Sequence, residues 1–368
     1  MKNTFATAAF RFLNALGLRH WLWILPLTTA GATDYTIHPD AIIRDHEGNP
    51  IHANSGDIVS SGDTWYWFGE DMTDYTFPSA TPGSVQWYAE FKGVNCYKSK
   101  DLVHWAFANV VLKKQPSGEV GPNREVSRPH VAWNVKTRKW VMLYHAENLL
   151  YDENMVGIAT SDAIDGDYTF IKKFRPGGER SLDLGVYQEG EDCYILYSWA
   201  NTGQRIDKLT PDYMEVAANV FSIKEQGEAP VIIKREGVYY WVNSELTGWD
   251  PNANFYRTAT SLAGPWSRKQ PLAPESNNTY GSQVFELIQV EELEVNGARG
   301  GCIYVGDLFD LKHFANSKTL WLPVEFTTDN HMILKRRDSW KLGVTGPAGK
   351  ALSNSPGLPA HSPTAVRQ

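Results

Sequence analysis

Three polar residues suited to acid–base chemistry stand at equivalent places in the sequence, each at the start of an apolar run. They are Asp183 in LDLGVY, Glu228 in EAPVII and Gln283 in SQVFELI. Hydrolysis of a glycosidic bond needs such a set, because one carboxylic acid must protonate the leaving oxygen while a second group handles water or the anomeric carbon. The sequence has no Gly-rich phosphate loop ending in Lys-Ser/Thr, no HExxH zinc helix and no GxSxG nucleophile motif. Carboxylates and amides gathered in a pocket are therefore the leading candidates.

The residues around Glu228 favour a role as a proton donor. A Glu enclosed in a pocket near a second carboxylate, here Asp183, has its ionised form disfavoured by desolvation and by like charge, so it can stay protonated near neutral pH. Pro230 follows Ala229, and a Pro pushes the residue before it towards extended geometry. The competing interpretations are structural: a solvent-exposed strand end for Glu228, a strand or turn cap for Asp183, and a hydrogen-bonded core amide for Gln283.

A repeat in the sequence indicates which elements would position these side chains. Aromatic, β-branched strand patterns occupy residues 64–69, 140–145, 193–199, 238–243 and 302–306. The strand before each of them opens with a polar residue: Ser55 with Asp57, then Arg128, Asp183, Glu228 and Gln283. Units of roughly 45 to 75 residues with several short strands each are typical of a β-propeller, and no helical period persists for more than about two turns. We predict an all-β fold, a five-bladed β-propeller whose polar strand starts converge on one pocket.

Composition limits the kinds of partner. The chain has 368 residues, 42% hydrophobic and 12% aromatic, enough for one large all-β domain or two ordinary ones. Its many Trp and Tyr suit packing between blades and equally suit stacking on sugar rings. The net charge is -7 and no run of Lys and Arg occurs, which argues against nucleic acid or an anionic membrane as a partner. We expect a monomer that acts on a polysaccharide or oligosaccharide.

The two ends of the chain differ from the rest. The first 33 residues lack Asp and Glu and combine basic residues, a short apolar run at 21–27 and small residues at 30–32. This pattern predicts a signal peptide over 1–32 and a secreted, extracellular protein that leaves the membrane once the signal is removed, with a transit peptide or signal anchor as the alternative. The last part, 344–368, is rich in Pro, Gly, Ser and Ala and is predicted to be disordered. The propeller is expected over 33–343.

The cysteines give no sign of a metal site. Cys96, Cys193 and Cys302 are the only three, and none lies in a close Cys/His cluster, so no structural zinc is expected. One disulfide with one free thiol and three buried thiols are both compatible with this number. The chemistry proposed above needs no organic cofactor, and the sequence does not decide whether a structural cation occupies the channel.

An ordered series of short motifs runs through the predicted propeller. They are GNPIHA at 48–53, WYWFGE at 65–70, RP at 128–129, SLDL at 181–184, EAP at 228–230, TGWDPN at 247–252, SQ at 282–283, GD at 306–307 and WLP at 321–323. In this order they resemble glycoside hydrolase family 43, and within it the branch of exo-β-1,3-galactanases (galactan 1,3-β-galactosidases). The resemblance covers about residues 45–342.

The resemblance implies a five-bladed propeller and an inverting mechanism. Glu228 would be the general acid, Asp183 the carboxylate that orients it and raises its pKa, and Gln283 the amide that replaces a missing base and holds the attacking water. The family at large has an Asp base at the first inner strand, where this chain has Ser55. Asp57 is the alternative base. Strand alternation predicts that it shares the face of Ser55, roughly 6 to 7 Å further along.

Six further residues are predicted to bind substrate: His52, Glu70, Arg128, Tyr144, Thr247 and Trp249. Glu70 could accept hydrogen bonds from sugar hydroxyls or be an exposed loop acid. Trp249 could stack on a sugar or serve only the turn, and His52 could line the pocket or stabilise the turn before the first blade. Tyr144 and His145 close the second aromatic strand, and either could reach the channel mouth.

One position departs from the galactanase branch. Where that branch typically has Glu-Arg-Pro, this chain has Ser127-Arg128-Pro129, and a lost substrate-binding carboxylate matters for which sugar is accepted. We expect a secreted inverting enzyme that releases galactose from the non-reducing end of β-1,3-galactan. The alternatives are an α-L-arabinofuranosidase or β-xylosidase, against which the missing base at Ser55 argues, and a non-catalytic carbohydrate-binding propeller.

Overall fold

The computed structural model describes residues 33–199, 202–290, 293–295 and 301–344. The predicted signal peptide at 1–32 and the predicted tail beyond 344 lie outside the described residues. Among those described, no helix is long and apolar enough to cross a membrane.

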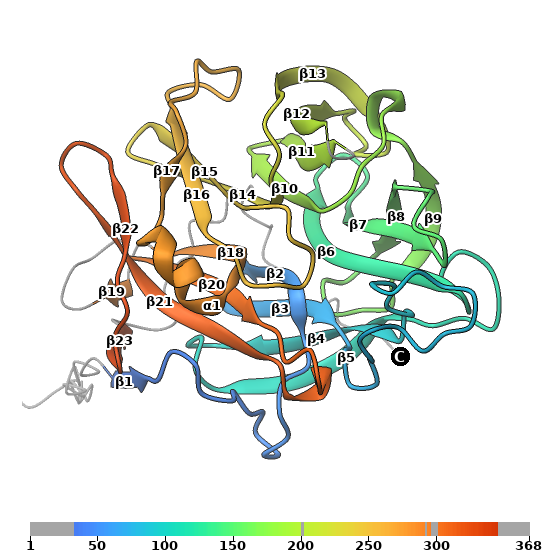
Figure 1. The fold of residues 1–368 in the computed structure, drawn as a ribbon, viewed down its shortest axis with the longest axis horizontal. Helices are drawn as coiled ribbons and strands as arrows, with labels where there is room; N and C mark the ends of the chain where they lie inside the picture. Colours follow the sequence, from blue (N-terminus) through green and yellow to red (C-terminus); the bar gives the residue numbers. More distant parts are fainter. Residues whose placement is uncertain (1–32, 200–201, 291–292, 296–300, 345–368) are drawn as a thin grey trace, which may run out of the picture. The chain divides into compact units, whose positions relative to one another are not determined.

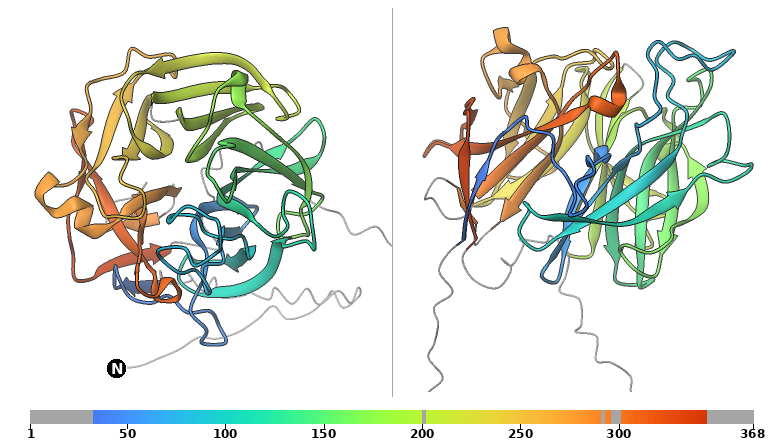
Figure 2. Two further views of the ribbon diagram at one scale, coloured as in Figure 1. Left: turned by 45° about the vertical axis from the view of Figure 1, so that its right-hand side comes forward. Right: turned by 90° about the horizontal axis from the view of Figure 1, so that it is seen from below.

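Five four-stranded antiparallel sheets follow one another around a central axis (Figures 1 and 2). The first is β2 (Asn54–Ser61), β3 (Thr64–Glu70), β4 (Gly93–Ser99) and β5 (Trp105–Lys113). The second is β6 (Arg124–Asn134), β7 (Lys139–Asn148), β8 (Met155–Ser161) and β9 (Thr169–Phe174). The third is β10 (Leu184–Glu189), β11 (Asp192–Trp199), β12 (Gly203–Leu209) and β13 (Val216–Ile223).

The fourth sheet is β14 (Glu228–Arg235), β15 (Val238–Ser244), β16 (Asn254–Ala259) and β17 (Gln270–Pro271). The fifth is β18 (Gln283–Val290), β20 (Gly301–Leu308), β21 (Lys318–Phe326) and β22 (Met332–Leu334), with the short helix α1 (Asn278–Gly281) before it. The prediction of a five-bladed β-propeller is confirmed.

The aromatic runs of the sequence form the second strand of each blade, namely β3, β7, β11, β15 and β20. These strands are buried on both faces because each blade packs between two others, and a strand covered on both sides reads as a near-continuous apolar run. Five of the six hydrophobic clusters of the described residues lie between neighbouring blades, one at each interface, and the sixth packs Met72, Tyr75, Ala89 and Phe314 together. Between the fifth and first blades, for example, Trp67 contacts Trp105 and Trp321 edge to face. The polar side chains lie instead at the starts of the innermost strands, where they line a cavity.

The innermost strands β2, β6, β14 and β18 each contain one extra residue near the start. In three of them a residue there, Ser55, Arg128 or Ala229, has a left-handed backbone, with φ of 51°, 52° and 52°. The expectation that Pro230 holds Ala229 extended is therefore wrong, because Ala229 is the left-handed residue of the bulge in β14. Each such residue costs on the order of 1–3 kcal/mol, a strain that proteins commonly accept at functional sites.

The ends of the described chain are tied together on the fifth blade. Strand β1 (Thr33–Ile37) pairs antiparallel with β23 (Trp340–Val344), which also pairs with β19 (Leu293–Val295). The Trp340 indole donates a hydrogen bond to the Trp321 carbonyl at 2.9 Å. Because β1 precedes the first blade and β23 follows the fifth, this sheet links the two ends of the propeller.

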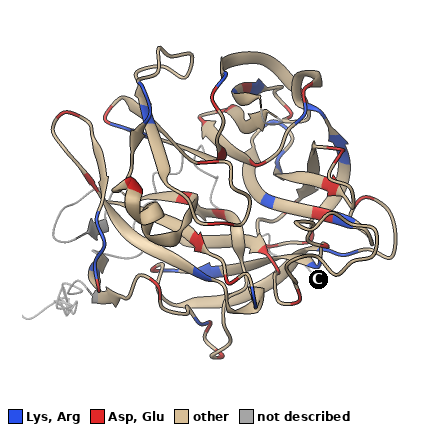
Figure 3. Ribbon diagram, viewed as in Figure 1, with Lys and Arg blue, Asp and Glu red and all other residues tan. Residues whose placement is uncertain are grey.

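The three cysteines, Cys96, Cys193 and Cys302, are buried and unpaired. Of the two arrangements compatible with the sequence, the structure shows the one with three buried thiols. Acidic and basic residues are interspersed along the ribbon (Figure 3).

Candidate active site

A cavity of about 520 Å³ opens where the innermost strands begin, a size in the ordinary range for ligand pockets. Seven of the nine predicted site residues line it: Glu70, Arg128, Asp183, Glu228, Thr247, Trp249 and Gln283. They come from all five blades and from the loop after β15. The strand starts that the repeat pointed to therefore do converge.

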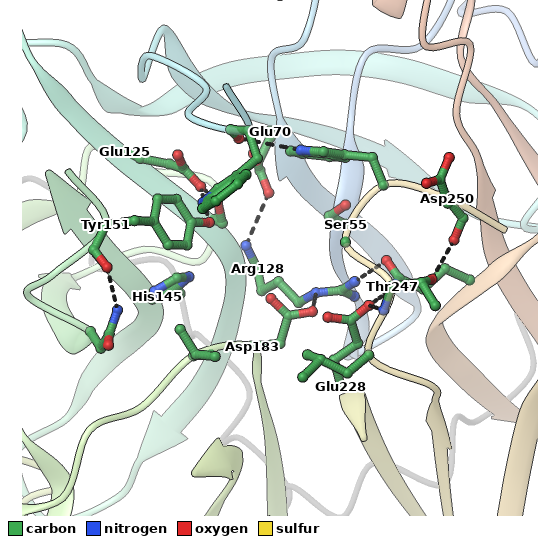
Figure 4. Close-up of a pocket in the computed structure, with 18 of the residues that line it drawn as sticks. Ser55, Glu70, Glu125, Arg128, His145, Tyr151, Asp183, Glu228, Thr247 and Asp250 are labelled. Carbon is green, nitrogen blue, oxygen red and sulfur yellow. Dashed lines mark hydrogen bonds and ion pairs between the residues drawn. The ribbon is translucent and has the colours of Figure 1, made fainter. Parts of the chain in front are cut away.

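Arg128 lies at the centre of the cluster (Figure 4). Its Nε donates to Asp183 Oδ2 at 2.8 Å and its Nη2 to Gln283 Oε1 at 2.6 Å. Its backbone N–H donates to Glu70 Oε1 at 3.1 Å. The guanidinium is almost fully buried, so a charge-assisted network of this kind fixes three pocket side chains with respect to one another.

Glu228 is 6% exposed, and burial, followed by the charge of Asp183, raises its pKa to about 8. The Arg128 cation and two hydrogen bonds act in the opposite direction on that pKa. One oxygen, Oε1, accepts both bonds: from Gln283 Nε2 at 2.8 Å and from the Thr247 N–H at 3.2 Å. At neutral pH the carboxyl is therefore mostly protonated.

The two oxygens of Glu228 are consequently different. Because Oε1 accepts two N–H groups, it must be the carbonyl-type oxygen of the protonated acid, and the proton belongs on Oε2. No hydrogen bond to Oε2 is made by the side chains or backbone of the described residues. The acid thus has a proton that is free to be donated into the cavity.

Gln283 is held by three hydrogen bonds. Its Nε2 donates to Glu228 and, at 3.1 Å, to Ser244 Oγ, while its Oε1 accepts from Arg128. Both N–H groups are in use, and an amide oxygen has two lone pairs. One acceptor position on Oε1 remains for a water molecule.

Ser55, which stands where the family has its Asp base, makes hydrogen bonds that stabilise the fold. Ser55 lines the cavity, but its Oγ donates to Asp307 Oδ2 at 2.9 Å, and its backbone N–H donates to the same oxygen at 3.0 Å. Asn54 Nδ2 donates to the other oxygen of Asp307. Burial raises the pKa of Asp307 to about 6. Asp307, at the end of β20, therefore stabilises the bulge at Ser55.

Asp57 does not share the environment of Ser55. The extra residue between Asn54 and Asp57 breaks the expected alternation, and Asp57 Oδ2 accepts from the Val131 N–H at 2.8 Å. With Glu286 it lines a second, smaller cavity of about 120 Å³ further along the innermost strands. The predicted shared face of Ser55 and Asp57 is wrong, and Asp57 is not a lining residue of the candidate active site.

Two predicted substrate-binding residues lie elsewhere. Tyr144 is fully buried in the core between the first and second blades, because its side chain points to the opposite face of β7 from His145, which does line the cavity. His52 is not among the lining residues; its backbone N–H and carbonyl bond Tyr97 and Asn95. His52 therefore belongs to the lead-in segment of the first blade.

Sequence reasoning missed Glu125, Tyr151 and Trp87, which also line the cavity. Glu125 could have been found, because it precedes Ser127 by two residues and so shares its face of the strand. Tyr151 and Trp87 lie in irregular loops, for which no periodicity applies. Trp249 Nε1 donates to the Trp87 carbonyl at 3.3 Å and so joins two loops of the rim.

Within the described segments, no group of three or more His, Cys, Asp and Glu side chains is arranged to hold a metal ion. The pocket offers carboxyl, amide, guanidinium and aromatic groups.

The model of glycosyl hydrolases family 43 matches residues 49–285. The chain belongs to this family. The solved structures most like it in the comparison include exo-β-1,3-galactanases from two organisms. One, from Phanerochaete chrysosporium with β-1,3-galactotriose, is 31% identical with a TM-score of 0.76, over 86% of this chain and 71% of the other. The second, from Clostridium thermocellum, is 31% identical with a TM-score of 0.72, over 83% and 66%. Comparison with curated protein sequences gave no match.

These matches confirm the resemblance to family 43 and to its galactanase branch. The chain is a glycoside hydrolase, and the cavity at the strand starts is its candidate active site.

Proposed function

We propose that this family 43 enzyme releases galactose from the non-reducing end of β-1,3-galactan, with inversion at the anomeric carbon. The observation that carries the proposal is the state of Glu228: a buried carboxyl with a pKa of about 8 and a proton free on Oε2. A general acid works best when its pKa lies near the working pH. The choice of galactose is supported by the galactanases at about 31% identity.

In the proposed reaction Glu228 gives its proton to the glycosidic oxygen as the bond to the anomeric carbon breaks. Asp183 keeps the pKa of Glu228 high and holds Arg128. Gln283 has no useful basicity, so its part is to orient water through Oε1 toward an anomeric centre that already has oxocarbenium character. After the water has attacked, its extra proton is released to solvent, Glu228 takes up a proton from solvent, and the sugar leaves with inverted configuration.

The test is hydrolysis of β-1,3-galactobiose followed by proton NMR. The proposal predicts galactose as the product, with the α-anomer appearing first because the β-linkage is inverted. If the β-anomer appears first, the reaction is not inverting. If neither β-1,3-galactobiose nor β-1,3-galactan yields galactose, the substrate assignment is wrong.

The same sample separates the alternatives. Aryl α-L-arabinofuranoside and aryl β-D-xyloside test the other family specificities, and calorimetric titration with galactobiose tests a binding protein without activity. Ser55 and Ser127 are the residues that favour a non-catalytic propeller, and the Oγ of Ser55 already donates to Asp307. The free proton of Glu228 favours catalysis.

We also propose that the enzyme is secreted and extracellular, since the composition of residues 1–32 is that of a signal peptide. Amino-terminal sequencing of protein recovered from the culture medium tests this, with a start close to residue 33 as the expected result.

A further inference from the structure

The wall of the pocket away from Glu228 carries two buried carboxyl groups that the proposed reaction does not use. Glu70 ends β3 and Glu125 lies near the start of β6; each is 1% exposed, and both line the cavity. Burial raises the pKa of both carboxyls, and the negative charge of Glu125 raises that of Glu70 further. Desolvating two neighbouring acids is costly. Packing alone does not explain their presence.

Glu125 is held from three separate segments. Its Oε1 accepts from Ser127 Oγ at 2.9 Å and from the Tyr151 hydroxyl at 2.7 Å, and its Oε2 accepts from the Ala89 N–H at 2.9 Å. A carboxylate offers about four acceptor positions, so one remains on Oε2. The side chain is fixed in place and still able to accept a ligand hydroxyl.

The small side chain at position 127 makes this arrangement feasible. Ser127 and Glu125 lie two residues apart on one face of β6, and the Ser127 hydroxyl is within hydrogen-bond distance of the Glu125 carboxyl. A longer side chain at 127 would displace that carboxyl. The departure at Ser127 thus removes an acid at one position and leaves room for the acid two residues earlier.

The same wall contains a buried imidazole with unused capacity. Neither ring nitrogen of His145 forms a hydrogen bond with any described residue, although Nε2 lies 3.6 Å from a carboxyl oxygen of Glu147. Buried polar groups are nearly always hydrogen-bonded. A polar ligand in the cavity would supply the missing partner.

We propose that Glu125 is the specificity-determining carboxylate of the pocket, binding the C3 and C4 hydroxyls of the terminal sugar together with Glu70. Figure 4 shows Glu125, Tyr151 and His145 on the opposite side of Arg128 from Glu228 and Thr247. A pyranose with C1 at Glu228 presents C3 and C4 to that opposite wall. The inference rests on the proposed function, since it takes the sugar at Glu228 to be the non-reducing end.

Binding of the C3 hydroxyl would determine which sugars of a chain can enter the pocket. A β-1,3-linked chain continues from C3 of each sugar. A wall of carboxylates against C3 admits a sugar with a free C3 hydroxyl and excludes one that is substituted there. Glu125 would therefore restrict the enzyme to terminal residues as well as to the configuration at C4.

The test is calorimetric binding of galactose and of its 3-deoxy, 4-deoxy and 6-deoxy analogues to the wild type, Glu125→Gln and Ser127→Ala. Glu286→Gln is the matched control, as the same substitution at a carboxyl that lines the other cavity. We expect the wild type to bind the 3-deoxy or 4-deoxy sugar at least about tenfold more weakly than galactose, a typical loss for a hydrogen bond to a charged group. Removal of the C6 hydroxyl should matter little.

Glu125→Gln should bind galactose at least about tenfold more weakly and no longer distinguish the 3-deoxy and 4-deoxy sugars. Ser127→Ala should show a smaller loss in the same direction, and Glu286→Gln should match the wild type. Wild-type binding by Glu125→Gln, or an equal loss for every sugar, overturns the proposal; so does a wild type that binds none of them. Binding of xylose or arabinose in place of galactose overturns the proposed substrate instead, and the deoxy comparison is then made on that sugar.

Discussion

Two glutamates on the innermost strands, Glu228 buried and Glu286 partly buried, have much in common and differ in what surrounds them. Glu228 opens β14 and Glu286 lies near the start of β18, and each has an aspartate near it on a neighbouring blade, Asp183 and Asp57. Burial, followed by the charge of that aspartate, raises the pKa of both. A raised pKa therefore does not by itself identify a catalytic acid.

The two acids face different spaces. Glu228 faces a cavity of about 520 Å³, while Glu286 lines one of about 120 Å³ whose other walls are mostly Val, Leu and Ile. The smaller cavity has room for a few waters at roughly 30 Å³ each but not for a chain of sugars. The two glutamates therefore differ in the size of the cavity that each one faces, and only that of Glu228 can hold a substrate.

Their partners differ as well. Glu228 lies in the network of the Arg128 cation, and two N–H donors on one oxygen leave its proton on the other. Glu286 Oε1 accepts a hydrogen bond from the backbone N–H of Leu287, and the Glu286 carboxyl also shares a hydrogen bond with Asp57. The proton of Glu286 is thus shared within a pair of acids, whereas that of Glu228 is available to a ligand.

The largest effect is expected for Glu228→Gln. Galactose release from β-1,3-galactobiose should fall by at least about a hundredfold, the usual scale of general acid catalysis, with binding nearly unchanged. An aryl galactoside with a good leaving group should recover part of the rate because it needs less protonation. Glu286→Gln should keep activity within about twofold. Wild-type turnover by Glu228→Gln on galactobiose would remove it from the acid role.

Gln283→Ala should reduce turnover on galactobiose by about tenfold or more, because orientation of the water is lost. Gln283→Glu should not accelerate the reaction, and Asp57→Asn should keep most activity because Asp57 is bound to Val131 and lies outside the catalytic cavity. Initial rates measured side by side give the ranking. A larger loss for Asp57→Asn than for Gln283→Ala would identify Asp57 as the base after all.

Asp183→Asn should move the alkaline limb of the pH–rate profile to lower pH. The negative charge of Asp183 raises the pKa of Glu228, and Arg128 lowers it. Removing Asp183 takes away the first influence and leaves the Arg128 charge uncompensated, so both changes lower the pKa of Glu228. The acid then loses its proton at a lower pH. An alkaline limb that stays in place or moves upward would show that the two carboxyls are not coupled.

The smallest effect concerns stability. An acid whose pKa is raised in the folded state stabilises the fold at low pH, and that contribution is lost as the pH rises through the folded-state pKa. For the pair of Asp57 and Glu286, burial and the charge of Asp57 raise the pKa of Glu286, so the melting temperature should fall as the pH rises above the ordinary glutamate pKa of about 4.3. Glu286→Gln should reduce this fall, as measured by calorimetry, while an unchanged slope would mean that Glu286 is not the group responsible.

The fold could be predicted from the sequence because each blade repeats the same pattern of a polar strand start followed by an aromatic strand. Asp183, Glu228 and Gln283 could be predicted for the same reason. The prediction from strand alternation was wrong at Asp57, because a single extra residue in β2 changes which side chains face the pocket. The residues around Ser55 do not by themselves predict this bulge, because it is stabilised by hydrogen bonds from Ser55 to Asp307 of the fifth blade.

The wall of the pocket away from Glu228 was harder to predict. Tyr144 and His145 are adjacent on β7, and the choice between them depends on which face packs against the neighbouring blade. Tyr151 and Trp87 come from loops that contact each other through their rings, and the Trp87 carbonyl also accepts a hydrogen bond from Trp249 on a third loop. Glu125 could have been predicted from the two-residue period of a strand, because it lies on the same face of β6 as Ser127.

The most direct test of the account is the pH dependence of kcat/KM for β-1,3-galactobiose, which reports the ionisation of essential groups in the free enzyme. The wild type should lose activity on the alkaline side around the pKa of about 8 that burial and Asp183 give to Glu228, and Glu286→Gln should show the same limb. An alkaline limb near the ordinary pKa of a glutamate, or one that moves when Glu286 is replaced, would contradict the assignment of Glu228 as the acid.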